Sequence, residues 1–335
     1  MGSTTTRVVV GEFLKGEKNP KVVGVGESET KGIRHGYIVN ISEAVSSLKN
    51  AISMAEKNSG IKIRRAFVSI GGVTLRGDVS SGIGIISKAD GEVTGLDINK
   101  ALQDCEDNLN LNNKKVIKVF PLSFKLDGKE ILGRPEGMKG TKLEIKALFI
   151  TCAISHFEDL LEVITLAGIE PIDIIASAEA GSRIVLSEKQ KIVGGALVNI
   201  GSETVSLSVF ENRTLVSLHT FSIGGADITN ELIENHLKKI KRNELLPAGV
   251  VFIGGSANIP LLEEFSKTAL KLPSRIGTTE IFGNIKTKLR DPSWFTALGL
   301  IMSDDDNNFY PEGLFKNFFK NLKRIIKLNI KQLMP

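Results

Sequence analysis

Residues 195–210 read GALVNIGSETVSLSVF, and no other stretch says as much about the fold. Two apolar runs, 195–200 and 204–210, flank a short polar segment that begins at Gly201. Such runs predict two buried strands, and the glycine predicts a tight antiparallel turn between them. The turn is either a plain hairpin or a loop whose backbone N–H groups face a bound anion.

Strands and helices alternate on both sides of this hairpin. Ser42 is expected to cap the first helix and Gly60 to end it. The pattern predicts strands at 7–13, 21–27, 65–70, 150–153, 172–176, 215–222 and 248–253. It predicts helices at 43–58, 156–167, 178–186, 227–241, 259–270 and 295–302. This alternation is typical of an α/β protein in which helices cover buried strands.

A segment of different texture interrupts the alternation from residue 72 to about residue 147. It contains a predicted helix at 99–108 and predicted strands at 116–126 and 143–149. We interpret it as a small α+β insert in the larger α/β body.

Three more glycine turns share the arrangement of a strand, a glycine, and then polar residues or a helix start. They lie at 2–6, 224–225 and 254–258. Glycine lets backbone N–H groups approach an anion closely, and a helix N-terminus adds partial positive charge. The candidate residues of these loops are Gly2, Ser3, Thr4, Thr5, Asn199, Gly201, Ser202, Thr204, Gly224, Gly225, Gly254, Gly255 and Ser256.

The C-terminal segment 313–335 carries an apolar stripe at helical spacing, surrounded by basic residues and no acid. Such a helix is too charged to span a bilayer but suits its surface. A helix packed on the body, a calmodulin-type target and a nucleic-acid arm are the alternatives. An acidic tether, 303–312, precedes it. The expected membrane-binding residues are Leu314, Phe315, Lys316, Phe318, Phe319, Lys320, Leu322, Lys323, Arg324, Ile325, Ile326, Lys327, Ile330 and Lys331.

Composition narrows the function classes. The formal charge of the chain is +5, and the tail contributes more than this, so the body is close to neutral. A nucleic-acid-binding body is therefore disfavoured. Cys105 and Cys152 lie far apart and are expected to be core residues in a reducing compartment. The histidines show no metal-ligand spacing, and no signal peptide or membrane span is evident, so we expect a cytosolic body.

The order of the loops and helices resembles the actin-like (ribonuclease H-like) ATPase fold, with two phosphate loops and an adenosine loop between two lobes. Within that fold the chain resembles the bacterial FtsA cell-division family. The resemblance rests on residues 2–12, 119–144, 170–180, 224–230, 246–255 and 291–300, and on the tail. It implies ATP and Mg²⁺ in an interdomain cleft, weak or absent hydrolysis with no assigned catalytic residue, and self-association. It also implies tethering of FtsZ filaments to the inner face of the cytoplasmic membrane.

The resemblance also implies domain boundaries. The first lobe is expected at 1–71 and 150–180, the family-specific insert at 72–149, and the second lobe at 181–302. The tether at 303–312 and the membrane helix at 313–335 follow.

The chain departs from the family pattern in three places. It begins inside the first phosphate loop, so we expect this lobe to lack one strand and the cleft to lack an acid. In the second loop Asn199 replaces an Asp and Glu203 replaces a glycine. Asn cannot supply the charge that holds Mg²⁺, and Glu repels phosphate, so weak ATP binding is expected. Residues 230–244 replace the whole subdomain that covers adenine and docks FtsZ.

The sequence therefore predicts a membrane-anchored scaffold of cell division that also recruits other division proteins. Two alternatives stay open. One is an ATPase in which hydrolysis drives a conformational change, and the other is a nucleotide-independent membrane adaptor of an envelope or pilus assembly machine.

Overall fold

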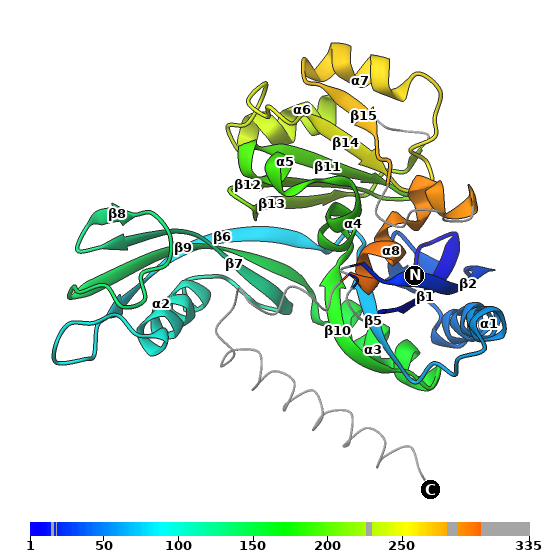
Figure 1. The fold of residues 1–335 in the computed structure, drawn as a ribbon, viewed down its shortest axis with the longest axis horizontal. Coiled ribbons are helices and arrows are strands. Elements are labelled where there is room, and N and C mark those ends of the chain that lie inside the picture. Colours follow the sequence, from blue (N-terminus) through cyan, green and yellow to red (C-terminus); the bar gives the residue numbers. More distant parts are fainter. Residues whose placement is uncertain (15–16, 18, 226–229, 280–286, 303–335) are drawn as a thin grey trace, which may run out of the picture. The chain divides into compact units, whose positions relative to one another are not determined.

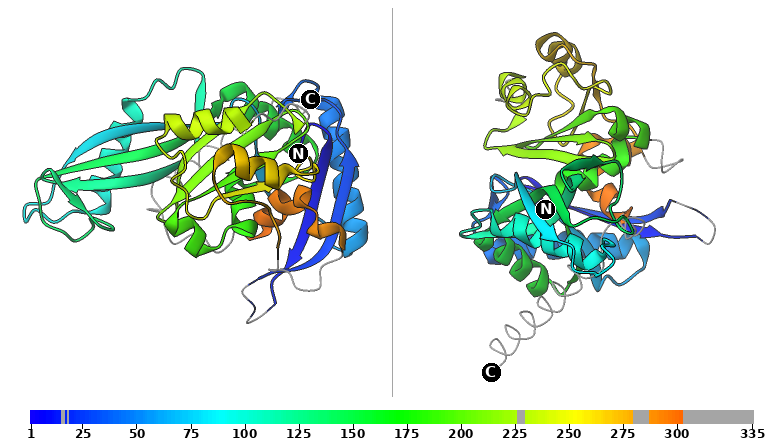
Figure 2. Two further views of the ribbon diagram at one scale, coloured as in Figure 1. Left: turned by 90° about the horizontal axis from the view of Figure 1, so that it is seen from above. Right: turned by 90° about the vertical axis from the view of Figure 1, so that its left-hand side faces the viewer.

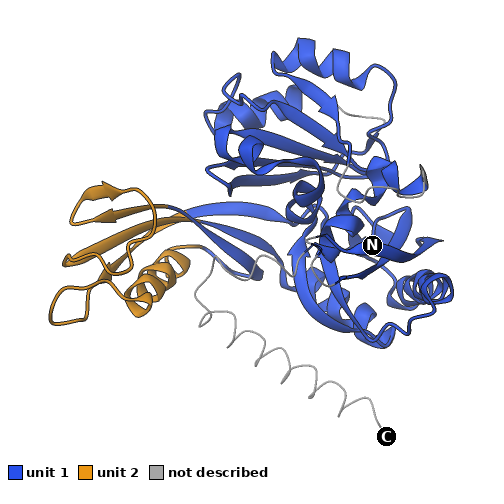
Figure 3. Cartoon of the chain, in the orientation of Figure 1, with its two compact units in different colours: residues 1–79, 110–122, 148–303 blue, residues 80–109, 123–147, 304–335 orange. Residues whose placement is uncertain are grey.

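The computed structural model describes residues 1–14, 17, 19–225, 230–279 and 287–302. Within this part the chain forms two compact units (Figure 3). Unit 1 comprises residues 1–79, 110–122 and 148–303, and unit 2 contains 80–109 and 123–147. The long strands β6 (Arg76–Ile85), β7 (Lys114–Leu126) and β9 (Lys142–Ala153) each contribute residues to both units.

A five-stranded sheet in the order β13-β12-β11-β14-β15 forms one part of unit 1 (Figure 1). The predicted hairpin is confirmed as β11 (Gly195–Ile200) and β12 (Val205–Glu211), which pair antiparallel. The strand β13 (Thr214–Phe221) extends the meander, and β14 (Val250–Ile253) and β15 (Ser274–Ile276) run parallel to β11. The strand β15, with only three residues, was not predicted from the sequence.

Alternation along β11 assigns its two faces to different helices. Ala196, Val198 and Ile200 belong to a buried cluster that also contains residues of α6 (Asn230–Lys239) and α7 (Leu262–Leu270). Leu197 lies on the other face, against Gly181 of α4 (Ser177–Val185). Because both faces are covered, the strand is apolar except at Asn199, near its end.

The remaining strands of unit 1 form short ladders. The strands β1 (Thr5–Glu12) and β2 (Lys21–Glu29) pair antiparallel, and β5 (Arg65–Ile70) pairs parallel with β10 (Glu170–Ala176). No described strand joins these two pairs. A hairpin of β3 (Ile33–Arg34) and β4 (Tyr37–Ile38), also missed in the sequence, precedes α1 (Ile41–Ser59).

Helix α1 lies against β1 and β2 (Figure 2), and two glycines of β2, Gly24 and Gly26, leave room for its close approach. A Cβ at Gly26 would lie 1.9 Å from the Ala51 carbonyl oxygen. Gly60 ends the helix as predicted, in the left-handed region with φ 71°. The expected cap at Ser42 is wrong: Asn40 is the N-cap, and its side chain accepts the Glu43 N–H. The helix begins one residue before Ser42, so that hydroxyl cannot serve as its cap.

Other predicted elements need smaller corrections. The predicted strands 143–149 and 150–153 are one strand, β9, which continues into α3 (Ile154–Leu166). The helix predicted at 227–241 is described from Asn230, and its first residues lie outside the described part. Helix α5 (Glu188–Val193) was not predicted from the sequence. The predicted last helix of the body is α8 (Phe295–Ile301), which lies so close to α4 that a Cβ at Gly299 would be 1.8 Å from the Ala180 carbonyl oxygen.

Unit 2 consists of β8 (Lys129–Ile131), α2 (Gly95–Asp107) and the adjoining parts of β6, β7 and β9. The sheet order is β6-β9-β7-β8. Gly82 and Gly84 lie on β6 and leave room for α2, since a Cβ at Gly82 would be 2.3 Å from the Cys105 nitrogen. Cys105 is buried and free, as is Cys152 in unit 1, and burial raises their pKa values to about 11 and about 12.

Candidate functional site

The second glycine loop is a tight hairpin turn at the end of β11. The Gly201 N–H donates to the Thr204 carbonyl at 2.8 Å, which closes the turn across Ser202 and Glu203. Asn199 precedes it on the strand, and its Nδ2 lies 3.5 Å from Thr296 Oγ1 on α8. The loop therefore has the geometry of a hairpin turn, and the other glycine loops contact it.

The third and fourth glycine loops meet this turn. The Gly225 N–H donates to the Gly201 carbonyl at 3.0 Å. The Ser256 N–H donates to the Ile200 carbonyl at 3.1 Å, and the Ser256 hydroxyl donates to the Gly201 carbonyl at 3.4 Å. Backbone from three distant parts of unit 1 therefore converges on one turn.

Glycine is required at two of these contacts. A Cβ at Gly224 would lie 1.6 Å from the Ser202 carbonyl oxygen. Gly254 has φ 99° and lies so close that a Cβ would be 2.3 Å from the Ile200 carbonyl oxygen. Any other residue at these positions would push the loops apart.

The first glycine loop reaches the same place through two hydroxyls. Thr4 Oγ1 donates to Ser202 Oγ at 2.6 Å, and Ser3 Oγ accepts the Gly36 N–H at 3.1 Å. The Gly2 N–H donates to the Thr5 carbonyl at 3.1 Å, within its own turn, and Thr5 begins β1. A Cβ at Gly255 would have open space, with the Ser293 Cβ 4.0 Å away as its nearest atom.

The β3–β4 hairpin supplies residues that the sequence analysis missed. The His35 backbone N–H donates to Glu203 Oε2 at 2.6 Å, and His35 Nδ1 lies 3.1 Å from the Glu203 carbonyl oxygen. Gly36 packs on Gly72 so tightly that a Cβ would lie 2.3 Å from the Gly72 Cα. Gly32 and Gly36 are the only hint of this hairpin in the sequence, because its partner at Glu203 is known only from the fold.

Glu203 is ionised in this setting. The hydrogen bond from the His35 N–H lowers its pKa, and the Ser3 hydroxyl and the charge of Arg34 act in the same direction, against a smaller effect of burial. The carboxylate is thus a stable negative charge between two of the loops.

Mg²⁺ and a triphosphate do not fit the loops in this arrangement. Asn199 is neutral, and the carboxylate of Glu203, the acid of the loop, already accepts the His35 N–H. No group of three or more potential metal ligands occurs in the described part of the chain. The N–H groups of Gly201, Gly225 and Ser256 donate to carbonyl oxygens of the protein, and the Glu203 carboxylate lies on the same turn.

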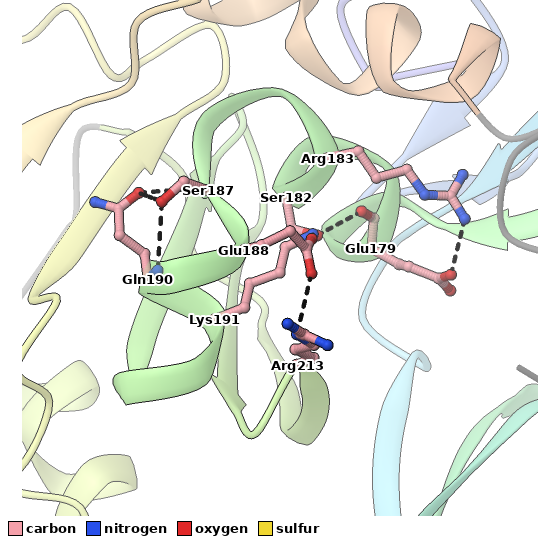
Figure 4. A network of polar contacts seen from close by, with 8 residues as sticks. All are labelled: Glu179, Ser182, Arg183, Ser187, Glu188, Gln190, Lys191 and Arg213. Carbon is pink, nitrogen blue, oxygen red and sulfur yellow. Dashed lines mark hydrogen bonds and ion pairs between the residues drawn. The ribbon is translucent and has the colours of Figure 1, made fainter. Parts of the chain in front are cut away.

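A second polar cluster lies along α4 and α5 (Figure 4). Glu179 is buried and accepts from Arg183 at 3.1 Å and from Lys118. Ser187 and Gln190 form the capping box of α5, and Glu188 pairs with Arg213 at 3.7 Å. These contacts hold α4 and α5 in place. The lobe boundary expected between residues 180 and 181 falls within the continuous helix α4.

The predicted membrane-binding residues, from Leu314 to Lys331, lie outside the described residues, as do the whole tether and the whole tail. None of the helices that the structure describes is long and apolar enough to cross a membrane.

Comparison with known proteins identifies the insert. Residues 72–151 match the family described as the SHS2 domain inserted in FtsA. The cell-division protein FtsA of Bacillus subtilis is 29% identical over 232 residues, which cover 69% of this chain and 52% of that protein. FtsA of Pseudomonas aeruginosa is 24% identical over 366 residues, which cover 90% of this chain and 87% of that one. The chain thus spans about half the length of some FtsA relatives and most of others.

Solved structures agree on the fold. A chain of the PilM–PilN type IV pilus biogenesis complex superposes with a TM-score of 0.67 at 12% identity, covering 90% of this chain and 96% of that one. The predicted α/β, actin-like fold with a small insert is confirmed. The SHS2 insert and these relatives confirm the resemblance of this chain to the FtsA cell-division proteins.

Proposed function

We propose that this protein is a membrane-anchored, actin-like scaffold of FtsA type that tethers FtsZ filaments to the inner face of the cytoplasmic membrane. The observation that carries the proposal is the SHS2 domain at 72–151, inserted in an actin-like body. A fold alone does not imply a function, but this insert is named for the FtsA family. We place the protein at the division septum.

The tail supplies the anchor in this proposal. Residues 313–335 carry three phenylalanines in an apolar stripe and six basic residues without an acid. Burial of the stripe at the acyl boundary and attraction of the basic face to anionic lipid support peripheral membrane binding.

The glycine loops are the proposed nucleotide site. The loops at 2–6, 199–204, 224–225 and 254–256 lie around the turn at Gly201. ATP, with Mg²⁺, is the ligand that the family suggests, and hydrolysis is expected to be weak or absent. Because Asn199 and Glu203 do not suit Mg-ATP, we place the function in tethering and self-association rather than in catalysis.

A second candidate function is a nucleotide-independent membrane adaptor of an envelope assembly machine. The Glu203 carboxylate already accepts the His35 N–H, and this contact favours the adaptor. A membrane adaptor that never binds ATP needs no free phosphate site. Only α6 is described between β13 and β14, which leaves little structure at the place where the family carries its FtsZ-docking subdomain.

A reconstitution separates the two candidates. The full chain is added with fluorescent FtsZ and GTP to vesicles that contain anionic lipid. The division scaffold predicts that FtsZ filaments coat the vesicles only when the chain is present. If the chain coats the vesicles and FtsZ stays in solution, the adaptor replaces the scaffold.

A further inference from the structure

We infer that Glu203 is a built-in anion that takes the place of a ligand phosphate and keeps polyphosphates out of the glycine loops. This inference rests on the proposed nucleotide site and makes Glu203 the residue that decides which ligands the site accepts.

Two successive backbone N–H groups of the β3–β4 hairpin point at the loops. His35 has φ 49° and Gly36 has φ 77°, both in the left-handed region. Consecutive N–H groups in such a conformation form a concave site for an anion. Here the His35 N–H donates to the Glu203 carboxylate at 2.6 Å, and the Gly36 N–H donates to Ser3 Oγ at 3.1 Å.

Ser3 lies beside the carboxylate. Its oxygen accepts from Gly36, so its own proton is free to donate, and the hydroxyl helps to lower the pKa of Glu203. The carboxylate thus accepts a backbone N–H and lies next to a hydroxyl, the kinds of donor that a phosphate oxygen would use.

Glu203 also joins segments that are distant in the chain. His35 and Glu203 are 168 residues apart, and Thr4 and Ser202 beside them are 198 apart. A bound nucleotide would bridge the same loops. With Glu203 in place, the bridge exists without a ligand, and an incoming phosphate meets a fixed negative charge.

The test compares Glu203→Ala and Glu203→Gln with the wild-type full chain. Glu264→Ala, which removes an exposed acid on α7, is the matched control. Affinities for Mg-ATP and for adenosine are measured by isothermal titration calorimetry. Amide hydrogen exchange of residues 33–38 is measured without ligand.

Glu203→Ala should bind Mg-ATP about tenfold more tightly or better, because one like charge is removed from the phosphate position. Adenosine affinity should not change, because adenosine carries no phosphate. Exchange at His35 should rise in the Ala variant. Glu203→Gln should gain much of the ATP affinity while it keeps most of the protection, since its amide oxygen still accepts the N–H.

Equal Mg-ATP affinity in Glu203→Ala and Glu264→Ala would overturn the inference. An equal gain for adenosine would also overturn it, because the cause would then be a wider opening rather than the charge. Failure of the proposed scaffold would show separately, as loss of FtsZ recruitment to vesicles in the wild type.

Discussion

At the scale of single residues, the glycines hold the site together. A side chain cannot fit at Gly224, because its Cβ would lie 1.6 Å from the Ser202 carbonyl oxygen. A Cβ at Gly255 would have no atom closer than 4.0 Å. We predict that Gly224→Ala lowers the free energy of unfolding by about 1–3 kcal/mol, because the loops must shift. Gly255→Ala should change it by less than about 0.5 kcal/mol. Urea unfolding of both variants measures the difference, and equal stabilities would show that the loops yield freely.

The sequence could predict the loops but not all of their partners. Glycine after a strand indicated the turns at Gly201, Gly225 and Gly254, and hydrogen bonds now link all three. His35 could not be found in this way, because its contact with Glu203 spans 168 residues and depends on the packing of the β3–β4 hairpin. The N-cap of α1 was assigned to Ser42 instead of Asn40 because both residue types cap helices and are two positions apart.

At the scale of elements, the start of α2 offers a pH-dependent test. Burial raises the pKa of Asp97, but hydrogen bonds from Thr94 and Ser87 outweigh it and lower that pKa to about 2. A lowered pKa stabilises the fold above the ordinary value near 4 and loses that contribution as the pH falls through about 2. We predict that Asp97→Asn costs about 2 kcal/mol at pH 7, because Thr94 and Ser87 lose a charged acceptor.

Urea unfolding between pH 7 and pH 2, followed by circular dichroism, checks this prediction. The stability difference between Asp97→Asn and wild type should shrink as the pH approaches 2. The matched control is Asp107→Asn, at the exposed end of the same helix. A difference that stays constant with pH would show that the Asp97 charge does not support the fold.

Long periodic elements were predictable, and short or edge elements were not. The strands 65–70 and 195–200 agree with β5 and β11 at both ends, because their apolar runs stop at glycine or polar residues. The elements missed include β15, with three residues, and α5, with six. Such short segments give too few turns or alternations to show a period. The strand β6 was missed for another reason. Gly82 and Gly84, which leave room for α2 to pack against the strand, resemble a turn in the sequence.

At the scale of the whole molecule, the short segment that contains α6 is expected to limit assembly. Helix α6 is the only helix described between β13 and β14. The resemblance to FtsA implies a whole subdomain there, which would supply part of one filament face. A filament grows only if both ends of the protomer carry a matching face. We therefore predict dimers or short oligomers on lipid monolayers with ATP, as seen by negative-stain electron microscopy. Long paired filaments would show that the short segment completes the interface.

The central claim is that the protein works at a membrane surface through its tail, and co-sedimentation with liposomes tests it most directly. We expect the full chain to sediment with liposomes that contain anionic lipid. Binding should weaken steeply with salt, since each basic residue near the surface contributes about 1 kcal/mol. Phe318→Glu with Phe319→Glu should abolish binding, whereas Phe265→Glu, at an exposed phenylalanine of the body, should not. Equal sedimentation of the double variant and the wild type would contradict the account.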